Sequence, residues 1–487
     1  MFFDHLSSAG SATINNNGAL VFQSLDHIHP QEGGSAGSAK IENNKSVLFV
    51  DKSTAGNATI INHDSLSFNH YSTAGSATIV NNSAMLFLGA SSAGNATITN
   101  NSGTGLTFDY FSSAGNATII NNSGGTLNFR DHGTGGTARF INDGTINLST
   151  LLTGMMTAGS IEGGGIIHLG GKNLTVGGNN LSTTFSGTLD GIGGSLTKAG
   201  AGTLTLAGVN TYSGDTTVNA GALLINGSIA SAAMVNNGGT LGGGGTIFNN
   251  VTVNSGGTFA PGAPGLPGSL MTVTGDVTFG PDAIYRVQAD PTTASLTQVN
   301  GIAHLNGSVQ MTFTAGSYTL GQQYTILQSS NPVAGVFQGI SSNGFLMPLH
   351  YDVDPQKVIV TLNAAALAAS AGLKQNHQNA AGTIDNIFNN GGALPGSFAS
   401  IFSLTGDSLA HALSQLSGEA ATGAQQGAFQ LGSQFLNLML DPSGPAIRRS
   451  PPSSRRCRTR ASSSTAHCPR LIPRSPPPGR SCVSRTA

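Results

Sequence analysis

The feature that most constrains this chain is a short motif that repeats about every 20 residues through its first third. The block Ala-Gly-Ser/Asn-Ala-Thr-Ile begins at Ala9, Ala55, Ala74, Ala93 and Ala114, with variants that begin at Ala36 and Gly135. Within each repeat, apolar residues alternate with polar ones, as in strands that have one buried face. One such repeat cannot bury its apolar side alone, so we expect successive repeats to stack into a solenoid.

An asparagine follows each block at a fixed distance. These asparagines are Asn16, Asn43, Asn62, Asn81, Asn100, Asn121 and Asn142. Asparagine tolerates the backbone of tight turns, so each one marks a turn between two strands. Amide side chains that stack from coil to coil can also hydrogen bond to one another. The sequence therefore predicts a structural repeat ladder made by these seven residues.

Composition favours stacked strands over a helical or a disordered chain. Glycine accounts for 69 of the 487 residues, 8% are charged and 38% are hydrophobic. That is too rich in glycine for a helical core and too apolar for disorder. All acidic residues lie at or before Asp441, and half of the Lys and Arg residues lie beyond residue 446. A mildly acidic body argues against nucleic acid as a partner, because phosphate binding needs clustered Lys and Arg.

Residues 196–223 carry a second and more specific pattern. The segment Leu-Thr-Lys-Ala-Gly-Ala-Gly-Thr-Leu-Thr-Leu leads into Asn-Thr-Tyr-Ser-Gly-Asp-Thr-Thr-Val-Asn-Ala-Gly. It resembles the passenger-associated transport repeat of autotransporters, which are type V secreted proteins of Gram-negative bacteria. The positions that carry this resemblance are Gly202, Thr203, Leu204, Leu206, Asn210, Tyr212, Gly214 and Gly221. We expect Leu204 and Leu206 to point inward and the residues after Asn210 to turn a corner.

The resemblance implies an all-β fold, a right-handed parallel β-helix (solenoid) with a short α-helical C-terminal linker and a disordered tail. Residues 1–157 are expected to form N-terminal repeats of 19–21 residues, and residues 158–257 a β-helix that contains the transport repeat. Residues 258–362 resemble the C-terminal passenger region of pertactin-like proteins, which caps the solenoid. We expect a helical linker at 363–444 and a disordered basic tail at 445–487.

The two ends of the chain raise separate expectations. The N-terminus has no basic segment followed by an apolar one, so no signal peptide is predicted. Helical patterns occupy 364–378, 408–416 and 424–440, and the motif at 413–419 resembles the segment that precedes the translocator barrel of autotransporters. The Arg-, Pro- and Cys-rich residues 445–487 do not match that barrel, which we expect to be absent. A reading-frame shift is the favoured explanation, and a natural disordered basic tail is the alternative.

Motifs for chemistry are weak in this sequence. Gly33–Gly37 matches the nucleophile motif G-x-S-x-G, but it lies in the register of the repeat. His27 and His29 could ligate a metal, although an insertion in the longest repeat explains them more simply. Acidic residues are scattered, as expected for solvated turns. We therefore predict no catalytic residue, no metal and no cofactor.

The sequence thus predicts a non-catalytic passenger, secreted or displayed at the cell surface or outer membrane, with an adhesin-like or structural role. Its expected partners are a translocator barrel, normally in cis, and a host-surface or self-association ligand. The first alternative is a carbohydrate-active β-helix enzyme, which a groove with two or three acids within about 10 Å would favour. The second is a non-functional truncated gene product.

Overall fold

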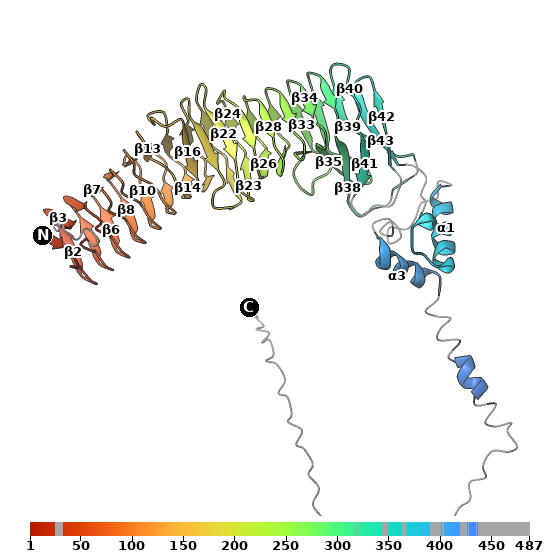
Figure 1. Cartoon of the computed structure of the whole chain (residues 1–487), viewed down its shortest axis with the longest axis horizontal. Helices are drawn as coiled ribbons and strands as arrows, with labels where there is room; N and C mark the ends of the chain where they lie inside the picture. The colour runs from red at the N-terminus through yellow and green to blue at the C-terminus, as the bar shows by residue number, and fades with distance from the viewer. Residues whose placement is uncertain are drawn as a thin grey trace, which may run out of the picture. The chain divides into compact units, whose positions relative to one another are not determined.

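The computed structural model is an all-β parallel solenoid, which confirms the fold expected from the repeats. It describes residues 1–24, 33–316, 318–319, 321–342, 349–362, 367–389, 401, 404–418, 426, 428–434 and 436. Contacts divide the chain into a unit of residues 1–420 and a unit of residues 421–487, and the solenoid lies in the first. Figure 1 shows its strands stacked one after another. Each coil adds a strand or a bridge to three faces, which we number in chain order.

The first face begins as single backbone bridges and becomes a sheet after residue 154. The bridges link Ser8, Ser35, Thr54, Thr73, Ser92, Ser113 and Thr134 from coil to coil. The nine strands that follow are β16 (Met155–Ala158), β19 (Asn173–Val176), β22 (Ser195–Lys198), β25 (Thr216–Val218), β28 (Ala233–Val235), β31 (Val251–Val253), β34 (Val277–Phe279), β37 (Ala303–Leu305) and β40 (Ala334–Gly335). They pair in parallel.

The second face consists of two eight-stranded parallel sheets. The first contains β2 (Thr13–Asn16), β4 (Lys40–Asn43), β6 (Thr59–Asn62), β8 (Thr78–Asn81), β10 (Thr97–Asn100), β12 (Thr118–Asn121), β14 (Arg139–Asn142) and β17 (Ser160–Glu162). The other contains β20 (Thr183–Phe185), β23 (Thr203–Leu206), β26 (Gly221–Ile225), β29 (Gly239–Gly243), β32 (Thr258–Pro261), β35 (Ile284–Ala289), β38 (Ser308–Phe313) and β41 (Gly339–Ser342). The second face is interrupted between β17 and β20, where one sheet ends and the next begins.

The third face also consists of two sheets. The ten strands of the first are β1 (Phe2–Asp4), β3 (Ala19–Gln23), β5 (Ser46–Phe49), β7 (Ser65–Phe68), β9 (Ala84–Phe87), β11 (Gly105–Phe108), β13 (Thr126–Phe129), β15 (Thr145–Asn147), β18 (Ile166–His168) and β21 (Thr188–Asp190). The second contains β24 (Val209–Asn210), β27 (Ser228–Ile229), β30 (Thr246–Ile247), β33 (Leu270–Val273), β36 (Leu296–Val299), β39 (Gln323–Ser329), β43 (Lys357–Leu362) and β42 (Leu349–Asp354).

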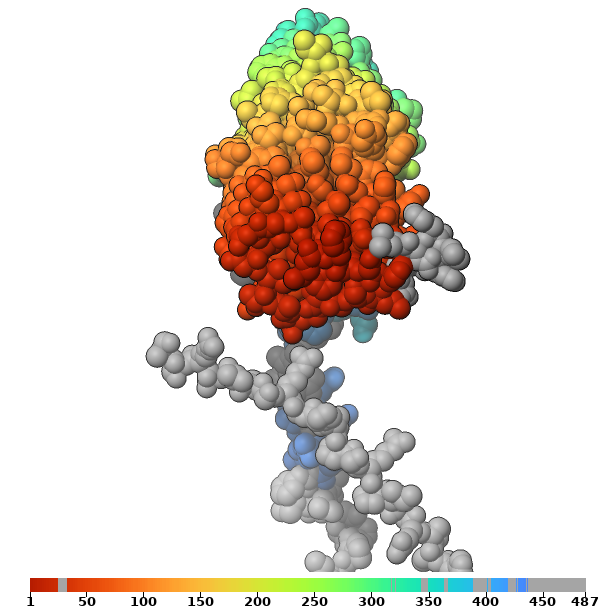
Figure 2. Space-filling view, turned by 90° about the vertical axis from the view of Figure 1, so that its left-hand side faces the viewer, coloured from red at the N-terminus to blue at the C-terminus, as the bar shows by residue number. Residues whose placement is uncertain are grey.

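Inside the solenoid, side chains of the same type stack from one coil to the next, because equivalent residues of adjacent coils pair in register. Ile60 pairs with Ile79, and Ile79 pairs with Ile98, as the sequence predicts. The third face contributes a phenylalanine stack, which consists of Phe3, Phe22, Phe49, Phe68, Phe87, Phe108 and Phe129. Neighbouring rings lie 4.6 to 5.1 Å apart and are within 4° to 11° of parallel. Figure 2, viewed from the first coils, shows atoms packed side by side across this end.

A column of buried serines lies at the corner between the third and first faces. Ser53, Ser72, Ser91 and Ser112 are 0 to 1% exposed. Their hydroxyl groups have no hydrogen-bond partner among the described residues. A buried hydroxyl without a partner does not stabilise a fold, so these serines contribute to the corner by filling space rather than by hydrogen bonding.

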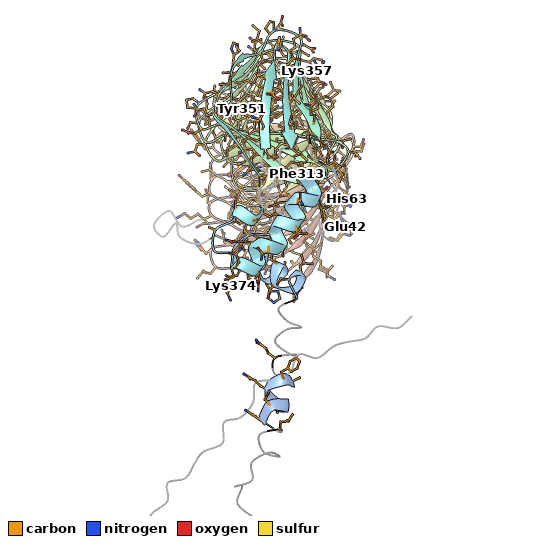
Figure 3. The ribbon with its side chains drawn as sticks, turned by 90° about the vertical axis from the view of Figure 1, so that its right-hand side faces the viewer. Glu42, His63, Phe313, Tyr351, Lys357 and Lys374 are labelled. Carbon is orange, nitrogen blue, oxygen red and sulfur yellow. The ribbon has the colours of Figure 1, made fainter. Side chains whose placement is uncertain are left out.

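The far end of the solenoid closes with antiparallel pairing. Strand β43 pairs antiparallel with both β39 and β42, so the parallel ladder stops there. Figure 3 shows Tyr351 on β42 and Lys357 on β43 at this end. The hairpin of β42 and β43 therefore ends the series of parallel strands on the third face.

Helices follow the solenoid, but the first differs from the expected helix at 364–378. Residues 367–369 form the 3-10 helix η1 (Leu367–Ala369), and α1 (Gln375–Asn389) begins after Gly372, whose φ of +83° ends helical backbone. The buried carboxylate of Asp385 accepts hydrogen bonds from the backbone N–H groups of residues 367 and 368, which holds η1 against α1.

The next helix, α3 (Gly406–Leu416), agrees with the pattern at 408–416. Within 424–440, the described residues 428–434 are helical. No described helix is long and apolar enough to span a membrane. The tail at 445–487, with its three cysteines, and the pair His27 and His29 lie outside the described residues.

Candidate functional site

The seven asparagines of the repeat form one hydrogen-bonded ladder at the corner between the second and third faces. Each side-chain Nδ2 donates to the Oδ1 of the asparagine in the next coil, from Asn16 through to Asn142, over 2.7 to 2.8 Å. Six of the seven are at most 1% exposed, and Asn16 is 8% exposed. Each also donates to a backbone carbonyl, either in the turn that follows it, as Asn81 does to Ser83, or at the start of the third-face strand of the next coil, as Asn43 does to Ser65. The ladder therefore holds the turns in register and leaves no amide free for a ligand.

The transport-repeat residues are likewise structural. Leu204 and Leu206 point into the core from β23 and are at most 1% exposed. Asn210 is buried, and its side chain accepts a hydrogen bond from the N–H of Leu189 and donates to the carbonyls of Gly208 and Ser228. These bonds join three successive coils at one corner.

Tyr212 is fully buried at the next corner of the transport repeat. Its hydroxyl is 2.5 Å from the hydroxyl of Thr216, which is 2.6 Å from the hydroxyl of Ser231. Burial raises the pKa of Tyr212 to about 12, so the phenol stays neutral. The chain of hydroxyls gives each buried oxygen a partner, and the corner is thus fixed by side chains rather than by a turn sequence alone.

Three glycines of the motif allow close approach between coils. A Cβ at Gly202 would lie 2.3 Å from the carbonyl oxygen of Leu181, and one at Gly214 would lie 2.6 Å from that of Gly194. Gly221 has a φ of +63°, and a Cβ there would lie 2.5 Å from two backbone oxygens. Thr203 lies at the start of β23, where its N–H donates to the hydroxyl of Ser182. The three glycine positions are therefore determined by the backbone.

Sequence reasoning passed over Lys198, which is the most unusual residue of this segment. Its side chain occupies the inward position that valine holds in neighbouring coils, and it is 1% exposed. The ammonium donates to the backbone carbonyls of Ala199, Gly200 and Ala220 over 2.7 to 3.1 Å. Burial lowers the pKa of Lys198 to about 8. The Lys198 side chain therefore supplies hydrogen-bond donors to three carbonyl groups at a glycine-rich corner.

The stability of the transport repeat should depend on pH through Lys198. Because its folded pKa of about 8 lies below the ordinary value of 10.5, folding disfavours the charged form. The unfolding free energy of wild type should rise, relative to a Lys198→Met variant, by about 2 kcal/mol between pH 7.5 and 9.5. Urea titrations of both proteins across this window measure the difference. If the unfolding free energies of the two proteins changed equally with pH, Lys198 would not be buried as described.

A second feature of the surface is a corner that carries exposed aromatic side chains. The turn between the third and first faces holds what we name the aromatic corner, namely Tyr71, Tyr110, Phe111 and His132. Tyr71 and Phe111 are both 67% exposed and Tyr110 is 55% exposed. The Phe111 ring stacks on the His132 ring of the next coil at 4.6 Å. The residues directly before Tyr71, Phe111 and His132 are His70, Tyr110 and Asp131, and each of these three has a φ of 50° to 53°. A non-glycine residue with positive φ is held there by the coils on either side.

A third feature is a pocket of about 520 Å³ on the second face. It lies where β17 ends one sheet and β20 begins the next, and we name it the seam pocket. One side is lined by residues of β14 and β17 and the residue after β17, namely Arg139, Ile141, Glu162 and Gly163. Its remaining wall carries the hydroxyl side chains of Ser182, Thr183, Thr184, Thr203 and Thr205.

Other sequence candidates fall into structural positions. Ser35, the centre of the G-x-S-x-G match, is a bridge residue of the first face, and its hydroxyl accepts the N–H of Gly37. Among the described residues, no group of three or more His, Cys, Asp or Glu side chains could hold a metal ion. Histidine–aspartate pairs such as His168–Asp190, at 2.8 Å, stand on the exterior of the solenoid.

Comparison with known proteins places the transport repeat in a recognised family. Residues 196–225 match the family model of the passenger-associated transport repeat. The chain is 36% identical over 166 residues to an extracellular serine protease of Serratia marcescens, which is 32% of this chain and 15% of that protein. It is 40% identical over 97 residues to the adhesin BmaC autotransporter of Brucella suis, which is 19% of this chain and 3% of that protein. The chain therefore spans a small part of the length of these relatives.

Proposed function

We propose, from the premise that this chain is an autotransporter passenger built as a parallel β-solenoid, that it is a non-catalytic, adhesin-like protein of the cell surface. Passengers of this kind are secreted or displayed outside the cell, and an outer-membrane translocator is the partner that the family implies. The observation that carries the proposal is the aromatic corner. Exposed aromatic side chains offer a large contact area at a low cost in conformational entropy, and they are enriched at binding interfaces.

The rigid backbone of the solenoid favours adhesion through the aromatic corner. Stacked coils hold Tyr71 and Phe111 on a rigid backbone, so little order is lost when they contact a partner. A surface covered with copies of the passenger would present many such corners at once. Contacts that are individually weak then add through multivalency.

The surroundings of the acidic residues support a non-catalytic role. Glu162 is the one carboxylate among the lining residues of the seam pocket, all of which are described, and its Oε1 accepts a hydrogen bond from Arg139 Nε. Glycoside hydrolysis ordinarily needs two carboxylates that face the same bond. Peptide hydrolysis is the second function to test, because the similarity to the extracellular serine protease extends over 166 residues of this chain.

We also propose that residues 258–362 act as the cap of the solenoid and residues 363–444 as a linker. The antiparallel hairpin of β42 and β43 supports the first assignment, because it ends the parallel stack. The η1–α1 contact through Asp385 supports the second.

Bead adhesion tests the proposed function. Latex beads coated with the full chain should bind cultured epithelial monolayers, or aggregate with one another, several-fold more than beads coated with a Tyr71→Ser/Tyr110→Ser/Phe111→Ser variant. The variant should keep its thermal unfolding midpoint, because these exposed rings make little contact with the core. Equal adhesion of the two proteins, or hydrolysis of casein or of a labelled polysaccharide by wild type, would overturn the proposal.

A further inference from the structure

The seam pocket exists because three consecutive corners of the solenoid differ in length. A single residue, Gly159, joins β16 to β17, whereas residues 177–182 join β19 to β20 and residues 199–202 join β22 to β23. The tight corner places β17 so that it links to β20 by the bridge between Gly163 and Phe185 rather than by a continuous ladder. The seam lies between β14 and β23, both of which Figure 1 labels.

A side-chain contact holds the longer corner against the start of β17. The Nδ2 of Asn179 donates to the hydroxyl of Ser160 on β17 at 3.0 Å. Gly159 has no room for a side chain, since a Cβ there would lie 2.0 Å from the carbonyl oxygen of Thr137. The tight corner at Gly159 is therefore set by the backbone.

The polar groups of the pocket carry no net charge. Arg139 Nε donates to Glu162 Oε1, and both side chains are only partly exposed. The other guanidinium nitrogens and the second carboxylate oxygen have no protein partner among the described residues. The pair thus presents donors and acceptors side by side, with the positive and negative charges already balanced.

The opposite wall adds hydroxyl groups that are also unpaired. Thr184 and Thr205 lie in register on β20 and β23, and no described residue hydrogen bonds to their hydroxyls. Each hydroxyl can donate and accept, and each threonine also presents a methyl group. Ile141 adds an aliphatic surface to the lining. A ligand that fits this lining has many hydroxyls, some C–H surface and no charge.

We propose that the seam pocket binds a neutral saccharide unit of a glycan. Vicinal hydroxyls of a sugar match the paired donor and acceptor groups of Arg139 and Glu162, while its C–H face lies on Ile141. An acidic sugar is disfavoured, because its carboxylate would lie beside the carboxylate of Glu162, and the repulsion between these like charges opposes binding to the remaining guanidinium nitrogens of Arg139. The use of this site in adhesion depends on the proposed function, but the binding itself does not.

A glycan array probed with the purified full chain tests this proposal, followed by calorimetry with the neutral oligosaccharide that binds best. We expect wild type to bind neutral glycans, and Thr184→Val/Thr205→Val to bind at least about tenfold more weakly, since two hydrogen bonds are lost. The matched control Thr78→Val/Thr97→Val changes exposed threonines on β8 and β10 of the same face, away from the pocket, and should bind like wild type.

A charge variant tests the class of sugar. Glu162→Gln leaves Arg139 without its counter-charge and should add binding of sialylated glycans to the array. Absence of neutral glycan binding by wild type, or equal affinity of the two threonine variants, would overturn the proposal. Binding of sialylated glycans alone by wild type would overturn the choice of a neutral sugar. Because no cells are used, failure here leaves the bead result standing, and failure of the bead test leaves this one standing.

Discussion

Replacement of Phe87 by alanine should lower the free energy of unfolding by about 4 kcal/mol, since a fully buried ring is removed from the core of the solenoid. Phe87 stacks on Phe68 and Phe108, with ring centroids 4.7 Å away on each side. The variant therefore loses two ring contacts as well as buried area. The rigid register of the backbone prevents neighbouring coils from closing the cavity. Guanidinium titration followed by circular dichroism measures the loss.

The comparison with Phe111→Ala separates burial from aromatic character. Phe111 lies on the aromatic corner and is 67% exposed, so its removal should change stability by less than about 0.5 kcal/mol. Hydrogen exchange adds a spatial test, because each coil of a solenoid is stabilised mainly by its neighbours. Phe87→Ala should speed exchange most in β7, β9 and β11. A uniform increase across all strands, or equal losses in the two variants, would contradict the nearest-neighbour account.

The repeat made most of the N-terminal fold predictable. Alternation of apolar and polar residues identifies the inward positions, and equal spacing implies that equivalent residues stack, as Ile60, Ile79 and Ile98 do. The serine column was not predictable in the same way. Ser72 sits in a polar turn, and its burial follows from the stacking of that corner between the coils on either side, which no local pattern of residues encodes.

The candidate sites were less predictable, because they arise where the repeat breaks. Lys198 lies in a segment rich in polar residues. Only the stacking of the coils shows that valines occupy the equivalent inward position in the two adjacent coils. The seam pocket depends on the lengths of three corners, and these lengths can be measured only when strand ends are known. The displaced start of α1 has a similar origin, since Asp385 and Gly372 outweigh the helical propensity of the preceding alanines.

Replacement of Asn81 by aspartate exchanges the amide nitrogen for an oxygen, and it should lower the free energy of unfolding strongly. Asn81 Oδ1 accepts from Asn62, and its Nδ2 donates to Asn100 Oδ1 and to the carbonyl of Ser83. Asn81→Ala removes these bonds and leaves buried groups unpaired, at a cost of about 3 kcal/mol. Asn81→Asp at neutral pH costs more, because a carboxylate cannot donate and would face two acceptor oxygens. The exposed neighbour Asn82→Asp is the matched control and should cost little.

The pH dependence of the aspartate variant tests the direction of the ladder. Burial among acceptors should raise the folded pKa of the new carboxyl above its unfolded value near 4. Its stability is then greatest below the unfolded pKa, where the protonated acid donates as the amide does, and is lost as pH rises through the folded pKa. Asn81→Asp should therefore be as stable as Asn81→Ala, or more so, at pH 3.5, and less stable at pH 7. If the difference between the two variants were the same at both pH values, the ladder would not require a donor at this position.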